Sequence, residues 1–275
     1  MSIVDDYFKR NCREILDGGV TETDAPRARW ADGQPAYTFR KFGVVNRYDL
    51  DSSKFPALTL RRVPINKAVD ELLWIWQKKS SNIRDLGSHI WDAWADEDGS
   101  IGKAYGYQMG ARHEYKEGWF DQVDRLIYDL KNNPDSRRMI TNMYTHADLH
   151  DMRLYPCAYS VTITVTGGRI NMLLNQRSQD MLVAFGWNVA QYAVLLHMLA
   201  NVSGYQPGEM LHVIADAHIY DRHVPLVREL LDREPYPAPS LSMPALDDFY
   251  AYTPKMIKLT GYRFHEFEHE IPVAV

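Results

Sequence analysis

The sequence predicts a single α+β domain, and three segments in its second half carry this prediction. Residues 159–178, YSVTITVTGGRINMLLNQRS, alternate apolar and polar side chains on both sides of a Gly-Gly pair, which is typical of a β-hairpin. Residues 188–205 are nearly all apolar, which indicates a buried helix. Residues 211–220, LHVIADAHIY, alternate again and predict a strand. No repeat, low-complexity segment or linker is visible, so we expect one domain over residues 1–275.

Local patterns predict the remaining elements. Helical spacing of apolar residues and helix-ending glycine or proline indicate three more helices, at residues 3–16, 66–79 and 118–133. Short β-rich runs predict two more strands, at residues 37–45 and 57–63. The polar segment 21–38 contains prolines and a glycine and reads as a loop, although Arg27, Arg29 and Trp30 are unusual for a plain linker.

Composition limits the class of protein. The chain has 275 residues, of which 45% are hydrophobic and 24% charged, as in ordinary globular proteins. Its net charge of -5 argues against a general nucleic-acid binder. Two cysteines cannot form a disulfide framework, which indicates a reducing compartment. The first residues lack a signal-peptide core, and the longest apolar run is too short to span a bilayer. We therefore expect a soluble, cytoplasmic protein without a membrane partner.

The predicted strand at residues 211–220 has one unusually polar face. A period of two places two groups of side chains on opposite faces. The polar face would carry His212, Ile214, Asp216, His218 and Tyr220, and the apolar face Leu211, Val213, Ala215, Ala217 and Ile219. Polar groups on a strand with an apolar reverse side indicate the floor of a polar cavity.

Cys157 is the candidate nucleophile. A lone cysteine is more often a small buried hydrophobe, and we assign that role to Cys12 on the first predicted helix. Cys157 differs because Pro156 restricts the backbone before it and the hairpin returns Arg177 to its neighbourhood. A nearby guanidinium favours the thiolate and lowers the thiol pKa. Arg177 with Ser178 also offers a fork of donors and a hydroxyl, which suit a phosphate.

Residue type alone leaves the roles of several other candidate residues undecided. Glu71 in DELLWIW is either an exposed residue on the polar side of a helix or a desolvated acid/base with a raised pKa. His146 and His150 have the i, i+4 spacing of metal ligands, but a solvated helix start explains them, and we predict no metal. No phosphate-binding loop or dinucleotide glycine pattern is present, which argues against NAD(P).

Several short motifs stand in an order that resembles one family. They are ELLWIWQ, IWDAWADEDGSIGKAYGYQ, NPDSRR, YPC, QRSQD, WNVAQY, DAHIYDRH and PVAV. Together they resemble thymidylate synthase over nearly the whole chain, and RARWADGQPAYT with a non-histidine after the cysteine is similar to the Bacillus-type branch. The resemblance implies a large mixed β-sheet flanked by helices, with a sheet face forming the interface of a homodimer.

The resemblance also implies a reaction. The family converts dUMP to dTMP with 5,10-methylenetetrahydrofolate as donor of one carbon and a hydride, giving dihydrofolate. Cys157 would add to C6 of the uracil ring, and neither a metal nor NAD(P) takes part. The main alternative is a hydroxymethylase acting on dUMP or, less readily, on dCMP with the same folate. Because Asn188 can donate to O4 and accept from N3–H, it argues against cytosine. Binding of the protein's own message RNA would be a side activity at most.

The resemblance also implies a role for each position of this sequence that matches a functional residue of the family. The implied catalytic residues are Cys157, Glu71, Tyr105 and Asn188. The implied dUMP-binding residues are Arg27 (with Arg29 as the alternative), Arg177, Ser178, Asn188, His218 and Tyr220, joined by Arg137 and Arg138 from the partner subunit. The implied folate-binding residues are Trp91, Trp94, Leu154, Asp180, Trp187 and Val275.

A few positions depart from the commoner family pattern. Ala158 stands where a histidine is usual, although a small residue there also occurs in the Bacillus-type branch. The other departures are Ala184 and Ala215 in place of glycines and Gly186-Trp187 in place of Pro-Phe.

Overall fold

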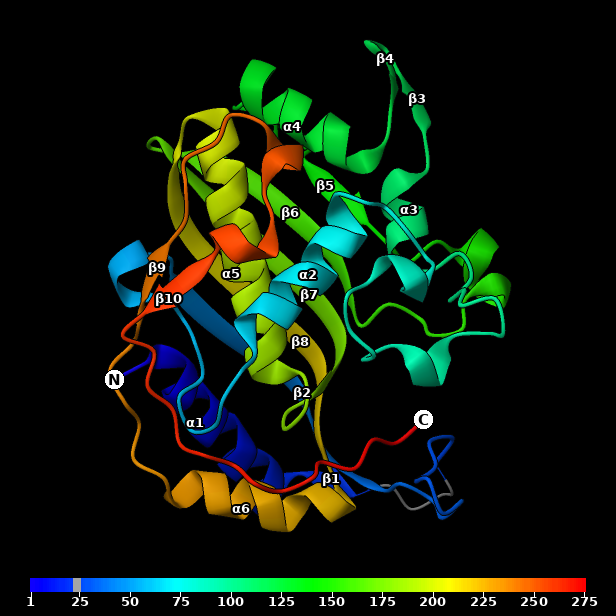
Figure 1. Cartoon of the computed structure of the whole chain (residues 1–275), viewed down its shortest axis with the longest axis vertical. Coiled ribbons are helices and arrows are strands. Elements are labelled where there is room, and N and C mark those ends of the chain that lie inside the picture. The colour runs from blue at the N-terminus through cyan, green and yellow to red at the C-terminus, as the bar shows by residue number, and fades with distance from the viewer. Residues whose placement is uncertain (22–25) are drawn as a thin grey trace.

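The computed structural model describes residues 1–21 and 26–275, which build a mixed sheet with helices on one face. The six strands of this sheet follow the order β1-β2-β8-β7-β6-β5 (Figure 1). Only β7 and β8 pair in parallel, and the other neighbours are antiparallel. The strands are β1 (Val20–Thr21), β2 (Thr38–Asp49), β5 (Ile140–Asn142), β6 (Ala158–Thr166), β7 (Arg169–Asp180) and β8 (Gln206–Tyr220).

Six α-helices and two small hairpins complete the described part. The helices are α1 (Ile3–Gly18), α2 (Ile65–Trp76), α3 (Gly106–Gly110), α4 (Gln122–Asn132), α5 (Phe185–Ser203) and α6 (Val224–Asp232). The hairpins pair β3 (His113–Tyr115) with β4 (Gly118–Phe120) and β9 (Ser240–Ser242) with β10 (Lys258–Thr260). Short 3-10 turns cover Ser52–Lys54, Ile83–Asp85, Asp92–Trp94, His146–Asp151, Asp221–His223, Phe249–Ala251 and Pro254–Met256.

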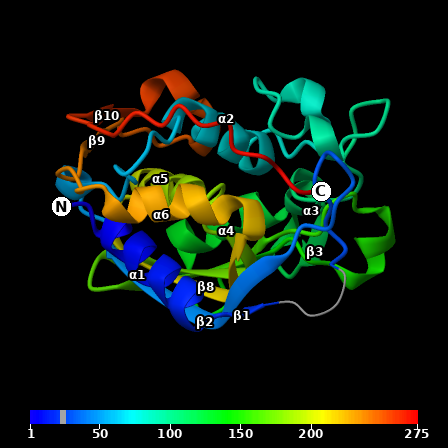
Figure 2. The same cartoon turned by 90° about the horizontal axis from the view of Figure 1, so that it is seen from below.

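Helix α5 forms the centre of the core, as its apolar sequence predicted. It is buried on nearly all sides because the sheet lies below it and α2 crosses it above (Figure 2). It ends at Gly204, whose φ of 76° is the left-handed conformation that glycine adopts most easily. The hairpin of β6 and β7 turns at Gly167 and Gly168, so this prediction is also confirmed.

The prediction of a strand at residues 57–63 is wrong. The segment is buried, but its backbone groups are paired by side chains instead of a neighbouring strand. The carboxylate of Asp5 accepts from the backbone N–H of Thr59 at 2.7 Å, and the Tyr262 hydroxyl donates to the carbonyl of Leu58 at 2.7 Å. Since these partners satisfy the buried polar groups, the segment needs no sheet.

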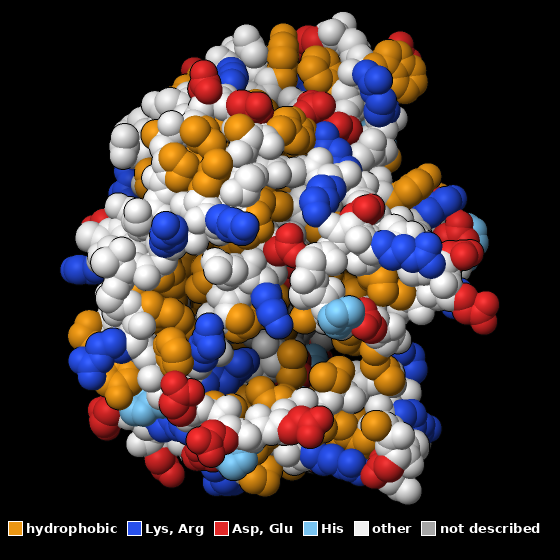
Figure 3. Space-filling view, in the orientation of Figure 1, with side chains coloured by type: hydrophobic (Ala, Val, Ile, Leu, Met, Phe, Trp, Pro, Cys, Tyr) orange, Lys and Arg blue, Asp and Glu red, His pale blue; other side chains and the backbone are white. Residues whose placement is uncertain are grey.

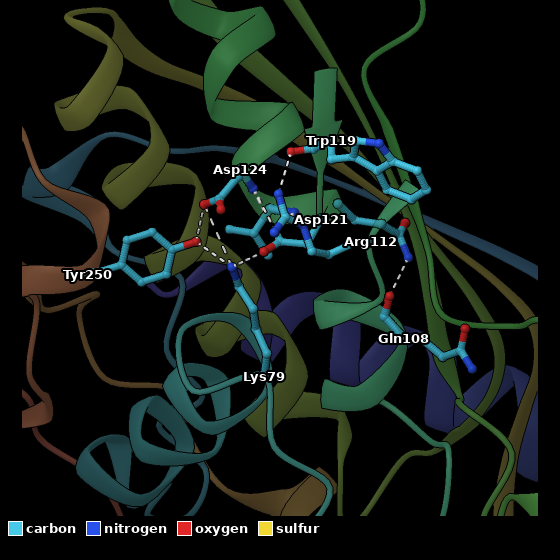
Figure 4. A network of polar contacts seen from close by, with 9 residues as sticks. Lys79, Gln108, Arg112, Trp119, Asp121, Asp124 and Tyr250 are labelled. Atoms are coloured by element: carbon cyan, nitrogen blue, oxygen red, sulfur yellow. Dashed lines mark hydrogen bonds and ion pairs between the residues drawn. The ribbon is translucent and has the colours of Figure 1, made fainter. Parts of the chain in front are cut away.

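The helix predicted from residue 118 begins later, at Gln122. Residues 118–120 form β4 instead, and the Asp121 side chain caps α4 by accepting from two backbone N–H groups at 2.9 and 3.0 Å. Asp121 also accepts from Lys79 Nζ, which lies beyond the end of α2 and contacts Tyr250 as well (Figure 4). This network joins α2, α4 and residues 249–251, so the cap belongs to a larger tertiary contact.

The outer face of the sheet carries exposed apolar side chains. Val45 is 51% exposed and lies opposite Val213, which is itself half-buried. Ile140 on the far strand is 55% exposed. The helices lie on the opposite face, so within the described residues no helix covers this one (Figure 2). Across that same described part, every helix is too short or too polar to cross a membrane.

Candidate active site

A cavity of about 380 Å³ opens between α2, the start of α5 and the segment around Cys157. Its walls are mainly apolar, with three indole rings among them. The apolar lining includes Ile75, Ile90, Trp91, Trp94, Leu154 and Trp187. The polar lining includes Glu71, Tyr105, Cys157, Asn188, Gln191 and Tyr192. Figure 3 shows this side of the molecule hollowed, with apolar and basic side chains around the depression.

The hairpin brings Arg177 to Cys157, as the sequence predicted. The backbone N–H of Arg177 donates to the carbonyl of Cys157 at 2.9 Å, and the guanidinium Nη2 lies 3.7 Å from Sγ. Two further bonds orient the guanidinium, to the carbonyls of Pro156 at 3.0 Å and Tyr155 at 2.6 Å. The thiol therefore has a fixed positive charge beside it.

The expectation that the pKa of Cys157 lies below its usual range is wrong. Burial raises the pKa of the thiol, and this effect outweighs the opposing charges of Arg177 and Arg27 and the hydrogen bond from Tyr105. The side chain still has partial solvent access. The free protein thus holds Cys157 as a thiol, with cations in place that favour the thiolate once a negative charge can form.

Glu71 is buried, so the exposed alternative is excluded. Three donors converge on its carboxylate: Trp91 Nε1 at 2.5 Å on Oε1, and Trp187 Nε1 at 2.6 Å and Gln191 Nε2 at 2.5 Å on Oε2. Burial raises its pKa, while these three hydrogen bonds oppose the rise. A buried carboxyl with a raised pKa at a cavity wall is a candidate general acid/base.

Asn188 lies in the first turn of α5 and lines the same cavity. Its Oδ1 accepts from Gln176 Nε2 and its Nδ2 donates to Gln191 Oε1, both at 3.2 Å. The amide therefore presents a defined donor and a defined acceptor.

Tyr105 adopts a strained backbone conformation beside Cys157. Its φ of 44° is rare for a residue with a side chain and costs on the order of 1–3 kcal/mol. Its hydroxyl accepts from the backbone N–H of Cys157 at 3.1 Å. Burial holds its pKa well above the usual range, so the phenol stays protonated. Strain at this position indicates that the hydroxyl has a functional placement.

The expectation that the polar face of the strand at residues 211–220 forms a cavity floor is wrong, because its polar side chains pair with one another or with neighbouring strands. His218 is buried and its Nδ1 lies 2.9 Å from Asp216 Oδ1, with the ring of Tyr220 edge-on at 5.2 Å. His212, by contrast, is buried between the sheet and α5, where its ring stacks on Phe185, and its Nε2 lies 2.8 Å from Gln176 Oε1. None of these four residues is part of the cavity lining itself.

Two residues implied for folate binding lie outside the cavity lining. Asp180 Oδ1 accepts from the backbone N–H groups of Leu182 and Val183, and its Oδ2 lies 3.6 Å from His223 Nδ1. Val275 exchanges two backbone hydrogen bonds with Arg29, at 2.7 and 3.0 Å. Trp91, Trp94, Leu154 and Trp187, the other four implied folate residues, all line the cavity.

The arginines occupy two separate places. Arg27 is exposed but close enough for its charge to lower the pKa of Cys157. Ser178, next to Arg177, is half-buried on β7 opposite Asp216. Arg137 and Arg138 are exposed and line a different hollow, of about 820 Å³, beside α4. One protomer thus does not bring all four arginines together.

Known proteins match this chain over almost its full length. The family model described as thymidylate synthase matches residues 6–275. The chain belongs to the thymidylate synthase family. It is 40% identical to thymidylate synthase of Bacillus subtilis subsp. natto and 39% identical to that of Bacillus phage phi3T, each over 96% of both chains. The solved structure of thermostable thymidylate synthase A from Bacillus subtilis superimposes with a TM-score of 0.93 at 38% identity, covering 99% of each chain.

The family match confirms the resemblance and the mixed α+β fold. The named relatives are thymidylate synthases, so they do not favour the hydroxymethylase alternative. Among residues 1–21 and 26–275, no group of three or more metal-ligating side chains is found.

Sequence reasoning missed several cavity residues, among them Arg61, Gln191, Tyr192 and Ile271. A signal for Gln191 was available, since it lies three positions after Asn188 and shares its helix face.

Proposed function

We propose that this protein converts dUMP to dTMP with 5,10-methylenetetrahydrofolate, and that Cys157 is its nucleophile. One observation carries the proposal. The Cys157 side chain lies in one cavity with Glu71 and Asn188, and Arg177 Nη2 lies 3.7 Å from its sulfur. This set supplies a nucleophile, a buried acid/base, an amide that can read the base, and a cation.

The residues divide the chemistry as follows. The thiolate of Cys157 adds to C6 of uracil, which makes C5 a carbon nucleophile. Glu71 moves a proton to and from the ring O4, and the hydroxyl of Tyr105 assists removal of the C5 proton. Between these steps C5 bonds to the methylene carbon of the co-substrate as its bonds to the folate nitrogens break, and a hydride from the folate converts this carbon to a methyl group. Elimination of the thiolate then restores the ring double bond and frees Cys157. Asn188 donates to O4 and accepts from N3–H throughout.

We assign activation of the buried Cys157 thiol to binding of the substrate. The phosphate of dUMP would be held by Arg27, Arg177 and Ser178, with His218 and Tyr220 bonding the 3'-hydroxyl of the deoxyribose. Water leaves the cavity as the substrate enters, which strengthens the attraction between Arg177 and the developing thiolate. Cys157 therefore becomes a nucleophile mainly when the substrate is in place.

The cavity walls suit a flat aromatic co-substrate. The indoles of Trp91, Trp94 and Trp187 offer ring faces and edges for stacking against a pterin, and Leu154 adds apolar contact. The folate supplies the methylene carbon and a hydride that together become the methyl group, and leaves as dihydrofolate. Asp180 would bind the pterin, and Val275 would close the site through its bonds to Arg29.

We further propose a homodimer that buries the outer sheet face. Val45 and Ile140 are apolar and more than half exposed on that face, which a second copy would cover. Arg137 and Arg138 lie apart from the cavity of their own chain, and we assign them to the phosphate in the partner's site. A two-fold interface makes this exchange reciprocal.

Product analysis tests the proposed reaction. The purified protein is incubated with dUMP and 5,10-methylenetetrahydrofolate, and nucleotides are separated by chromatography with mass detection. We expect dTMP and an equal amount of dihydrofolate, and none with Cys157→Ser. Hydroxymethyl-dUMP with tetrahydrofolate as the other product, or no turnover, would contradict the proposal.

A further inference from the structure

An unbroken chain of hydrogen bonds links Asn188 to Glu71 through Gln191. Gln191 Oε1 accepts from Asn188 Nδ2 at 3.2 Å. Gln191 Nε2 donates to Glu71 Oε2 at 2.5 Å and to the backbone carbonyl of Ala68 at 2.9 Å. Gln191 is itself buried, so water does not replace these partners. One amide thus contacts both the residue that reads the base and the acid/base.

The orientation of this chain is fixed at both ends. A backbone carbonyl and a carboxylate can only accept, so the Gln191 amide nitrogen must point to Ala68 and Glu71. The Gln191 oxygen then faces Asn188, so Asn188 must donate to it through Nδ2. At the other end, Gln176 Nε2 donates to the Ser178 carbonyl at 3.0 Å and to Asn188 Oδ1 at 3.2 Å. One orientation of the Asn188 amide therefore satisfies both hydrogen-bond partners, and the flipped orientation satisfies neither.

We infer that Gln191 is a positioning residue that locks the Asn188 amide for uracil and couples it to Glu71. The inference rests on the proposed function and extends it to a residue to which the sequence analysis assigned no role. Uracil offers an acceptor at O4 and a donor at N3–H, which match the locked Nδ2 and Oδ1. Cytosine offers the reverse, and an inverted Asn188 would set oxygen against Gln191 Oε1 and nitrogen against Gln176 Nε2. Selectivity against cytosine therefore depends on Gln191 as well as on Asn188.

The same residue acts on the charge of Glu71. Burial raises the pKa of Glu71 and the hydrogen bond from Gln191 opposes that rise, so removing the bond raises the pKa further. The other ionisable groups facing this carboxyl are Asp70 on the same helix, Tyr105, Tyr192 and the cavity residues Arg61 and Cys157. These remain in place when Gln191 is changed, so a shift in the pH profile reports the lost bond.

Two variants separate the effect of Gln191 on the orientation of Asn188 from its effect on the pKa of Glu71. Gln191→Met keeps the length of the side chain and removes its three hydrogen bonds, to Asn188, Ala68 and Glu71. Gln191→Glu keeps an oxygen for Asn188 Nδ2 but replaces the donor to Glu71 with a second carboxyl, which raises the pKa of the pair. Asn201→Leu is the matched control, because it removes an amide from the same helix that bonds Tyr252 and Pro244 far from the cavity.

The experiment measures dUMP and dCMP binding by calorimetry and the pH profile of dTMP formation. For Gln191→Met we expect the ratio of dUMP affinity to dCMP affinity to fall about 5–10-fold, the size of one lost hydrogen bond. We also expect the limb of the pH profile that reports ionisation of Glu71 to move to higher pH. For Gln191→Glu we expect the limb to move at least as far while the preference narrows less. Asn201→Leu should leave both unchanged.

Each outcome has one meaning. An unchanged preference in folded Gln191→Met, or an unmoved limb in Gln191→Glu, overturns the inference. If Gln191→Met does not fold, the limb of Gln191→Glu decides alone. Absence of dTMP from the wild type refutes the proposed function instead, so the two failures are distinguishable.

Discussion

Glu71→Gln changes one buried carboxyl to an amide of the same shape. Oε1 accepts one hydrogen bond, from Trp91, whereas Oε2 accepts two, from Trp187 and Gln191. The new amide can keep its oxygen at the side of the two donors and turn its nitrogen towards Trp91. The indole N–H of Trp91 then loses its acceptor, while Trp187 and Gln191 keep theirs.

This geometry sets the expected magnitudes. One buried donor without a partner costs about 1–3 kcal/mol, and removal of a desolvated charge offsets part of that cost. The free energy of unfolding should therefore fall by less than about 3 kcal/mol. Loss of the acid/base should lower kcat by roughly 100-fold or more, which corresponds to at least about 2.7 kcal/mol of activation free energy.

The assay combines steady-state kinetics, dUMP binding and urea unfolding on wild type and variant. Glu14→Gln is the matched control, since it makes the same chemical change on an exposed carboxyl of α1 that pairs with Lys41, outside the cavity lining. We expect dUMP affinity to change only a few-fold in Glu71→Gln and kcat to stay near wild type in Glu14→Gln. A folded Glu71→Gln variant with a near-normal kcat would refute the assigned role.

Three further predictions test other residues. Asn188→Asp should weaken dUMP turnover and narrow or invert the preference over dCMP, because an oxygen then faces O4; unchanged selectivity would show that another residue reads the base. Cys157→Ala and the double variant Arg137→Ala with Arg138→Ala should each be nearly inactive, yet mixed dimers refolded from both should regain about half the wild-type activity, because both defects fall in one of two sites. No recovery in mixed dimers confirmed by mass would place the arginines in their own subunit's site. Burial lowers the pKa of His197 to about 4, so below its unfolded value of about 6.5 only the unfolded state gains the proton. At fixed protein concentration, wild type should lose about 2 kcal/mol more stability than His197→Leu between pH 6.5 and 5, and equal losses would contradict this.

The elements that were predictable have strong local signals. The hairpin of β6 and β7 has a period of two and a Gly-Gly turn, and its register alone brings Arg177 to Cys157. Residues 57–63 have an equally strong β pattern, yet they form no strand because Asp5 and Tyr262, distant in sequence, pair their backbone. Tertiary partners of this kind are invisible to local pattern.

The candidate site was likewise predictable where local motifs define it and not where tertiary contacts do. Motif order identified the cavity residues that share family patterns, such as Glu71 and Trp91. The direction of the pKa shift at Cys157 was predicted wrongly. Burial, which raises the pKa, is a property of the whole fold, whereas Arg177, which lowers it, is visible in the local sequence. Gln191 was missed because its importance lies in its partners, one on α2 and one on α5, and not in its residue type.

The central claim is that Cys157 attacks the pyrimidine ring. The most direct measurement is mass spectrometry of the protein incubated with 5-fluoro-dUMP and 5,10-methylenetetrahydrofolate, followed by peptide mapping. Fluorine cannot leave C5 as a proton does, so the covalent complex should accumulate, with the added mass on the peptide that contains Cys157. An adduct on Cys12, an adduct that survives Cys157→Ser, or no adduct under conditions that support turnover would contradict the account.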